Sequence, residues 1–409
     1  MDHGDSVIEI TPNNVREIKQ IPFIGRQVLK KICNINHGQM DVHLVDGTVL
    51  RLRGANPGPY AVIHIDNPQF WRMLAMSGDL GFATAYIEGL WHTDDLTAVI
   101  ELGARNMDGF SADFVGSRLH RLFQHICHRF RRNSTKGSRE NIISHYDLGN
   151  AFYAQWLDES MTYSSALFTP DNSCLTNAQE AKYRALAERI HLKPEQKLLE
   201  IGSGWGGFAE YAAREHDARV TSITISPSQF EYAKKRIFDS GLNEKVDIRL
   251  QDYRDLTEKY DRIASIEMFE AVGEEYWPLY FEKINKCLAP EGRAGLQIIT
   301  INDDFYHAYR KGADFIQRFI FPGGMLPSQA ILRQHIERAG LVLQDAYSFG
   351  RDYAQTLKLW QVRFLDAWPA LLKQGFDERF RRMWQYYLSY CEAGFLAGNI
   401  DVGQFVLRR

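Results

Sequence analysis

The chain has few cysteines, no long apolar run and no excess of charge of one sign. Its 409 residues include five scattered cysteines without a C-x-x-C pair, which excludes a disulfide framework and a zinc ribbon and fits a reducing compartment. The net charge of −3 gives no overall attraction to nucleic acid, and we expect no such partner. No stretch reaches the ~18 apolar residues of a spanning helix, and the N-terminus lacks a signal pattern. We therefore expect a cytoplasmic protein that meets the inner face of the cell membrane only peripherally.

The first part of the chain reads as a small α+β domain over residues 1–130. Apolar and polar residues alternate on both sides of Asp46-Gly47, which predicts a β-hairpin. A linker at 131–140 then leads to a larger domain at 141–409.

Residues 116–139 carry seven Lys/Arg, three His and no acid. Leu119, Leu122, Phe123, Ile126 and Phe130 recur at helical spacing, which predicts a basic amphipathic helix. Such a helix suits contact with an anionic membrane surface. Packing between domains with a solvated basic face is an equally good interpretation. His125, Cys127 and His128 do not share one helix face, so we expect no metal site there.

Strands and helices alternate through the larger domain. Buried-strand patterns occur at 197–201, 219–224, 246–250, 262–268 and 295–301, with helical stretches between them. This alternation predicts an α/β fold, with a mostly parallel sheet covered by helices on both faces.

A glycine loop follows the first of these strands, in "LLEIGSGWGGFAEYAARE". Gly202, Gly204 and Gly207 satisfy the dinucleotide pattern G-x-G-x-x-G, but the next strand ends in "SITISPSQ" without the acid that binds the NAD ribose. Glu200 with Gly202, Gly204 and Gly206 also satisfies E-x-G-x-G-x-G, the usual loop of S-adenosylmethionine-dependent methyltransferases. Glycines there let the backbone approach the amino-acid end of the cofactor.

Further segments make a family resemblance specific. These are "HYDLGNAFYAQWLDESMTYSSALF", "LQDYRDL", "SIEMFEAVGEEYWPLYF", "FIQRFIFPGGMLPS", "SFGRDYAQTLKLW" and "YYLSYCEAGF". With them the chain resembles the cyclopropane fatty acid synthase and mycolic acid methyltransferase family from about residue 140 to 409, and more loosely over 80–96. The resemblance implies a Rossmann-like class I methyltransferase domain with a seven-stranded sheet.

The resemblance also implies the cofactor contacts. Tyr163 and Ser164 are expected at the methionine portion, and Asp252 and Tyr253 beside the adenine. The loop beneath the cofactor would comprise Leu198, Leu199, Glu200, Ile201, Gly202, Ser203, Gly204, Trp205 and Gly206. The segment reaching the ribose would comprise Thr224, Ile225, Ser226, Pro227, Ser228 and Gln229.

In similar enzymes a bound bicarbonate acts as the base. The cage carried over by position is Ser165, Glu270, Ile299, Ile301 and Tyr353. The family usually has cysteine at the position of Ser165 and histidine at that of Ile299, and Ala271 replaces another histidine. Isoleucine donates no side-chain hydrogen bond, although Gln297 shares its strand face and is expected to compensate in part. Replacing Ile299 by histidine should then raise the share of cyclopropane product.

The resemblance assigns a catalytic role to Cys391, whereas an apolar packing role is the competing interpretation. The implied reaction is methyl transfer to the double bond of an unsaturated phospholipid acyl chain. The product would be a cyclopropane, or, without ring closure, a methyl-branched or methylene chain; a conjugated or already modified chain is another possible substrate. Aromatic side chains including Phe305, Tyr306, Phe315, Phe319 and Phe321 offer faces for a cation or ordinary core. A small-molecule methyltransferase and a non-catalytic lipid-binding protein are the rival functions. Similar bacterial enzymes are commonly dimers, which implies a homodimer.

Overall fold

The computed structural model describes residues 7–107, 148–170 and 174–409. The chain forms two compact units. Unit 1 groups the N-terminal residues up to 129 with 312–315 and 372–399, and unit 2 holds the rest. The predicted linker at 131–140 and the basic segment at 116–139 lie outside the described residues.

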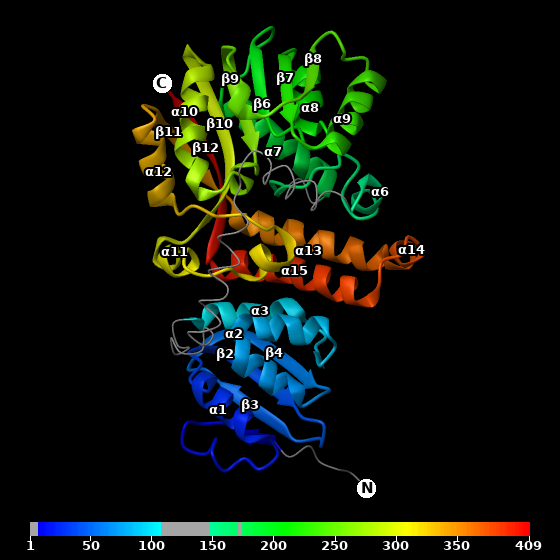
Figure 1. The fold of residues 1–409 in the computed structure, drawn as a ribbon, viewed down its shortest axis with the longest axis vertical. Helices are drawn as coiled ribbons and strands as arrows, with labels where there is room; N and C mark the ends of the chain where they lie inside the picture. The colour runs from blue at the N-terminus through cyan, green and yellow to red at the C-terminus, as the bar shows by residue number, and fades with distance from the viewer. Residues whose placement is uncertain (1–6, 108–147, 171–173) are drawn as a thin grey trace. The chain divides into compact units, whose positions relative to one another are not determined.

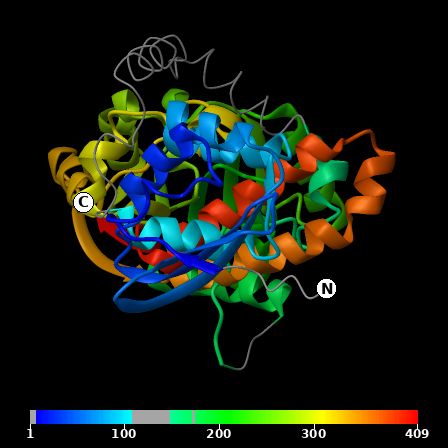
Figure 2. The same ribbon diagram turned by 90° about the horizontal axis from the view of Figure 1, so that it is seen from below.

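Unit 1 is built on a five-stranded sheet in the order β1-β3-β2-β4-β5 (Figures 1 and 2). The strands are β1 (Val7–Glu9), β2 (His37–His43), β3 (Val49–Arg53), β4 (Asn56–Ile65) and β5 (Trp91–His92). The predicted hairpin is confirmed, because β2 and β3 pair antiparallel with His43 opposite Val49. Gly47 in its turn has a φ of 84°, a conformation that favours glycine.

The helices of unit 1 come from both ends of the chain. They are α1 (Phe23–Ile32), α2 (Gln69–Ile87), α3 (Leu96–Arg105) and α15 (Glu378–Ala397). The last of these packs on α3 and α2, where Thr97 Oγ1 donates to Glu392 at 2.9 Å and the Tyr86 and Tyr386 rings lie 5.8 Å apart. A helix from the far end of the sequence thus completes the N-terminal unit.

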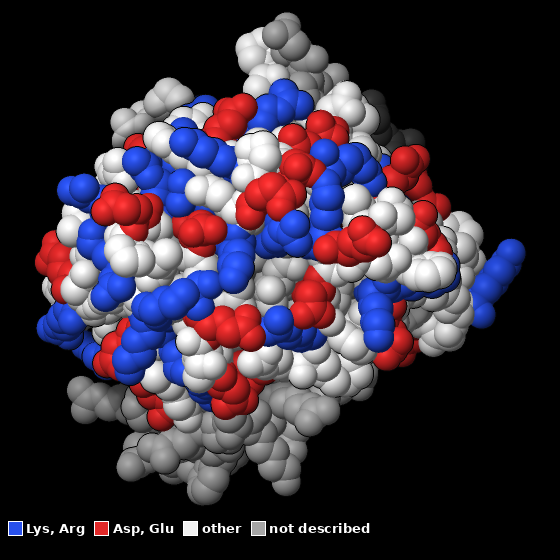
Figure 3. Space-filling view, turned by 90° about the horizontal axis from the view of Figure 1, so that it is seen from above, with Lys and Arg blue, Asp and Glu red and all other residues white. Residues whose placement is uncertain are grey.

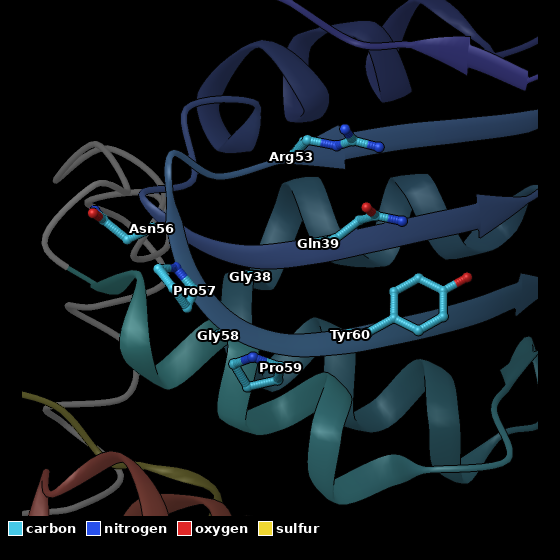
Figure 4. Close-up of a pocket in the computed structure, with 8 residues that line it drawn as sticks. All are labelled: Gly38, Gln39, Arg53, Asn56, Pro57, Gly58, Pro59 and Tyr60. Atoms are coloured by element: carbon cyan, nitrogen blue, oxygen red, sulfur yellow. The ribbon is translucent and has the colours of Figure 1, made fainter.

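A hollow of about 360 Å³ lies on the sheet of unit 1 (Figure 4). Its lining consists of Gly38, Gln39, Arg53, Asn56, Pro57, Gly58, Pro59 and Tyr60. Beside it Asp41 accepts hydrogen bonds from Arg51 and Tyr60. None of the residues predicted to bind the cofactor lines this hollow.

Unit 2 contains a seven-stranded sheet in the order β11-β12-β10-β9-β6-β7-β8 (Figure 1). The strands are β6 (Lys197–Ile201), β7 (Arg219–Thr224), β8 (Val246–Leu250), β9 (Tyr260–Ile266), β10 (Leu288–Ile301), β11 (Val342–Ser348) and β12 (Ile400–Arg408). Neighbours from β10 to β8 pair parallel, and β12 runs antiparallel to both β10 and β11. The predicted mostly parallel α/β sheet is therefore confirmed.

Helices cover both faces of this sheet, and each layer buries its own apolar cluster. One cluster joins the sheet to α7 (Leu175–Arg189), α8 (Gly207–His216) and α9 (Pro227–Asp239). The other joins it to α10 (Trp277–Cys287) and α12 (Gln329–Arg338). Burial of both faces explains why these strands read as continuous apolar runs.

The remaining helical elements are shorter or follow the sheet. They are α6 (Asn150–Tyr153), η3 (Tyr253–Asp255), η4 (Phe269–Ala271), η5 (Glu274–Tyr276), α11 (Asp303–Tyr309), η6 (Ile316–Ile320), α13 (Gly350–Asp366) and α14 (Trp368–Lys373). Across the described residues, no helix is both long and apolar enough to cross a bilayer.

Candidate functional site

The glycine loop connects β6 to α8 through backbone conformations that favour glycine. The φ angles of Gly202, Gly204 and Gly206 are 97°, 50° and 84°. A Cβ on Gly202 would lie 3.0 Å from the Met268 side chain, whereas one on Gly204 would meet nothing within 4 Å. The loop is thus tightly supported at its start and open at its middle, which suits a ligand lying over its backbone.

Glu200 lies at the end of β6 and is fully enclosed. Its carboxyl accepts a hydrogen bond from Ser222 Oγ, which also contacts Ser203 Oγ at 2.8 Å. Burial raises the pKa of Glu200 from 4.5 to about 8, against the opposing effects of Ser222 and Lys182. This side chain holds the loop to the neighbouring strand β7.

The segment after β7 is fixed by local hydrogen bonds. Ser226 caps α9 by accepting from the Gln229 backbone N–H, and Thr224 Oγ1 donates to Gln229 Oε1 at 3.0 Å. At the end of β8, both carboxylate oxygens of Asp252 accept from Arg254. Because β6, β7 and β8 are neighbouring parallel strands, these segments meet at one edge of the sheet, where α/β proteins bind ligands.

Tyr163 and Ser164 precede the sheet in the chain. The Tyr163 ring lies 5.3–5.6 Å from the rings of Tyr153, Trp156 and Trp360. Ser164 Oγ accepts a 2.6 Å hydrogen bond from Lys182 Nζ. Burial lowers the pKa of Lys182 to about 7, although nearby carboxylates, first among them Glu267, favour its charged form.

Glu267 was not among the predicted site residues. It lies at the centre of a polar cluster that it forms with Ser165, Gln297 and Tyr353. It directly follows β9, with a φ of 49°. Its Oε1 accepts from the Ser165 backbone N–H and from Gln297 Nε2, both at 2.8 Å, and its Oε2 accepts from Tyr353 Oη at 2.6 Å. A carboxylate at the carboxyl end of a central parallel strand is the sequence signal that would have found it.

Glu270 lies one turn further along, in η4. Its Oε1 accepts from the Ile299 backbone N–H at 2.5 Å, and its Oε2 has no hydrogen-bond partner among the described residues. Burial, with a smaller effect from Glu267, raises the pKa of Glu270 to about 8. Glu267 and Glu270 are both half-buried.

The other predicted cage positions lie around this pair. Ile299 faces it through its backbone N–H, and Gln297 supplies the side-chain donor on the same strand face. The Ile301 backbone N–H donates instead to the Pro327 carbonyl. The larger share of cyclopropane expected for Ile299→His stays a prediction. Gln297 already donates a side-chain hydrogen bond at this site.

Cys391 lies on α15 in unit 1, whereas the glycine loop and both carboxyls belong to unit 2. Burial, followed by the charge of Asp314, raises the pKa of the Cys391 thiol. A raised pKa disfavours the nucleophilic thiolate and agrees with a packing role.

The two enclosed carboxyls Glu200 and Glu270 should make the protein less stable as pH rises. Between about pH 4.5 and pH 8 the unfolded chain releases protons that these groups keep in the folded state, so the free energy of unfolding falls. Each contributes at most about 5 kcal/mol over this range. In denaturant unfolding from pH 5 to 8, the free energy of unfolding should fall less steeply with pH for Glu200→Gln than for the wild type. The same change at exposed Glu337 should leave the slope unaltered, and equal slopes in all three proteins would contradict the assignment.

Comparison with known proteins gives a consistent result. The profile of the family described as mycolic acid cyclopropane synthetase matches residues 133–405. The chain is 39% identical to the tuberculostearic acid methyltransferase UfaA1 of Mycobacterium tuberculosis, over 83% of this chain and 81% of that one. It is 36% identical to the cyclopropane-fatty-acyl-phospholipid synthase of Escherichia coli, over 88% and 90%.

Solved structures agree with the sequence comparison. The structure of mycolic acid cyclopropane synthase CmaA1 complexed with SAH and CTAB has a TM-score of 0.63 and 29% identity, covering 66% of this chain and 98% of that one. The cyclopropane synthase MmaA2 of Mycobacterium tuberculosis gives a TM-score of 0.62 at 30% identity, with 66% and 98% covered. The fold predicted from the alternating strands is that of class I methyltransferases.

Proposed function

Because this chain belongs to the mycolic acid cyclopropane synthetase family and is an S-adenosylmethionine-dependent methyltransferase, we propose that it methylates the double bond of unsaturated phospholipid acyl chains. The observation that carries the proposal is the enclosed carboxyl pair Glu267 and Glu270, at the same sheet edge as the glycine loop. Such a pair can supply the base for the proton that a methylated acyl carbocation must lose.

S-adenosylmethionine fits the residues present. The open face of Gly204 leaves room over the loop. We assign contact with the ribose to Gln229 and Ser226, in place of the acid that is missing after β7. We assign Tyr163, Ser164, the 198–206 loop, the 224–229 segment, Asp252 and Tyr253 to holding it. When bound, it supplies an electrophilic methyl group on a sulfonium.

The chain's own residues then have three tasks. They align the acyl double bond with the methyl group, because an isolated alkene is a poor nucleophile and positioning supplies most of the rate. They keep water from the acyl carbocation. They accept a proton. If it leaves the new methyl group directly, a ring closes; if it leaves after a hydride shift, the product is a methylene chain or a methyl-branched chain that keeps a double bond.

The lipid must be reached at a membrane. Basic and acidic side chains are interspersed on the face in Figure 3, and this face offers no single-sign patch. From its composition we assign contact with an anionic membrane surface to the basic segment 116–139, and propose that the protein acts at the inner face of the membrane, as a homodimer. Flotation with anionic and zwitterionic vesicles tests the membrane contact, and light scattering tests the homodimer.

Acyl-chain analysis of bacteria expressing the protein tests the function. Mass spectrometry should show monounsaturated chains gaining one methylene group, and mild hydrogenation should distinguish a ring or branch from a remaining double bond. Cells carrying the empty vector serve as the control. Unchanged acyl chains together with a methylated headgroup or soluble metabolite would contradict the proposal.

A further inference from the structure

The donors expected to hold a bicarbonate ion already hold a carboxylate of the chain. The backbone N–H of Ser165 and the hydroxyl of Tyr353, both carried over as bicarbonate contacts, donate to Glu267 at 2.8 and 2.6 Å. Bicarbonate presents the same O–C–O geometry as a carboxylate and would compete for these donors. It would also bring a second negative charge against Glu267. Bicarbonate therefore does not fit this cluster.

On the proposed function, we propose that Glu267 is the catalytic base that takes the proton from the methylated acyl carbocation, in the place of a bound bicarbonate. For ring closure, a C–H bond of the new methyl group breaks and its electron pair forms the C–C bond to the cationic carbon. For a methylene product, a hydride shift first moves the cation to the methyl-bearing carbon, and a methyl C–H bond then breaks to give the C=C bond. The proton passes to a Glu267 carboxylate oxygen and leaves to solvent before the next turnover. No oxidant or other co-reactant is needed.

Neighbouring side chains orient Glu267 for this task. Gln297 on β10 lies opposite Gln404 on β12, and its Oε1 accepts from Gln404 Nε2 at 3.2 Å. That bond turns the Gln297 amide N–H group toward Glu267. The Glu267 backbone N–H donates to the Gln297 carbonyl at 2.8 Å, which fixes the start of the turn after β9.

The surroundings of Glu267 and Glu270 favour different roles for the two carboxyls. Lys182 from α7 contributes a favourable charge, and three donors stabilise the carboxylate, although burial raises its pKa overall. Glu270, with a pKa raised to about 8, keeps its proton at neutral pH. Two neighbouring acids in different hydrogen-bond surroundings commonly take separate roles.

The backbone conformation at Glu267 allows the carboxylate to be removed by glycine without backbone strain. A φ of 49° is unfavourable for a non-glycine residue, and glycine adopts it freely. Glu267→Gly therefore removes the carboxylate, relieves strain and opens space for an anion. Asp217→Gly is the matched control, because Asp217 is an acid with a φ of 55° that ends α8 and pairs with Lys245 outside the cluster.

Turnover on unsaturated phospholipid vesicles should be measured with and without bicarbonate in carbon-dioxide-free buffer. Wild-type turnover should not depend on bicarbonate, and Glu267→Gln should lose about 10²–10⁴-fold, the usual contribution of a general base. Glu267→Gly should lose as much and regain at least about tenfold with bicarbonate, while Asp217→Gly stays within about twofold of wild type. Wild-type turnover that requires bicarbonate, or an undiminished Glu267→Gly, would overturn the inference.

A second readout does not need turnover. Carbon-13 NMR of labelled bicarbonate should show binding to Glu267→Gly and none to wild type; binding to wild type would overturn the inference even with no lipid present. Failure of the wild type to methylate any unsaturated phospholipid would instead reject the proposed function, and the anion result would still decide whether Glu267 takes the place of bicarbonate.

Discussion

Gly202→Ala should weaken S-adenosylmethionine binding by about 30- to 100-fold. Its φ of 97° lies in a region that residues with a Cβ rarely adopt, and the added Cβ would lie 3.0 Å from the Met268 side chain. Relieving both conflicts must move the loop, at about 2–3 kcal/mol. Titration calorimetry with S-adenosylmethionine measures the change.

The matched control is Gly241→Ala. Gly241 also has a positive φ, of 68°, and a Cβ there would meet nothing within 4 Å. Both variants should lose stability through the backbone, and only Gly202→Ala should lose cofactor affinity. Equal affinities in the two variants would show that the loop does not hold the ligand.

Tyr353→Phe should lower turnover by about 10- to 100-fold and leave S-adenosylmethionine affinity unchanged. The change deletes a 2.6 Å hydrogen bond to the Glu267 carboxylate and keeps the aromatic ring. A hydrogen bond to a charged group contributes about 1.5–3 kcal/mol, which converts to this range. Steady-state turnover and calorimetry on the same preparation separate the two effects.

Tyr60→Phe is the control for the loss of a tyrosine hydroxyl. Tyr60 Oη donates to the Asp41 carboxylate at 3.0 Å in unit 1, so the variant loses a similar bond away from the carboxyl pair and should keep its turnover. In a Glu267→Gly background the effect of Tyr353→Phe should disappear, because its partner is gone. A full additional loss there would mean that Tyr353 acts by another route.

The sequence patterns predicted strands β6 to β10 of the larger sheet and missed β11 and β12. The apolar runs at 197–201, 219–224 and 246–250 coincide with β6, β7 and β8, because strands buried on both faces carry their signal locally. The pattern at 295–301 found only the second half of β10, which begins at Leu288. The grouping of α15 with the N-terminal unit depends on interactions such as that of Thr97 with Glu392, nearly three hundred residues apart, and leaves no local pattern.

The same distinction between local and long-range signals applies to the residues of the site. The glycine loop was predictable because its constraint lies in consecutive backbone angles. Glu267 was missed because its donors come from three distant parts of the chain, at Ser165, Gln297 and Tyr353. Only the folded structure shows that these groups serve a side chain of the protein.

The most direct test of the account follows a deuterium-labelled methyl group from S-adenosylmethionine into vesicles of monounsaturated phospholipid. The purified protein should form S-adenosylhomocysteine and labelled acyl chains in equal amounts. A ring or methylene product should keep two of the three deuterium atoms, because one leaves to the base. Formation of S-adenosylhomocysteine with the label on a headgroup, or with no labelled lipid, would contradict the account.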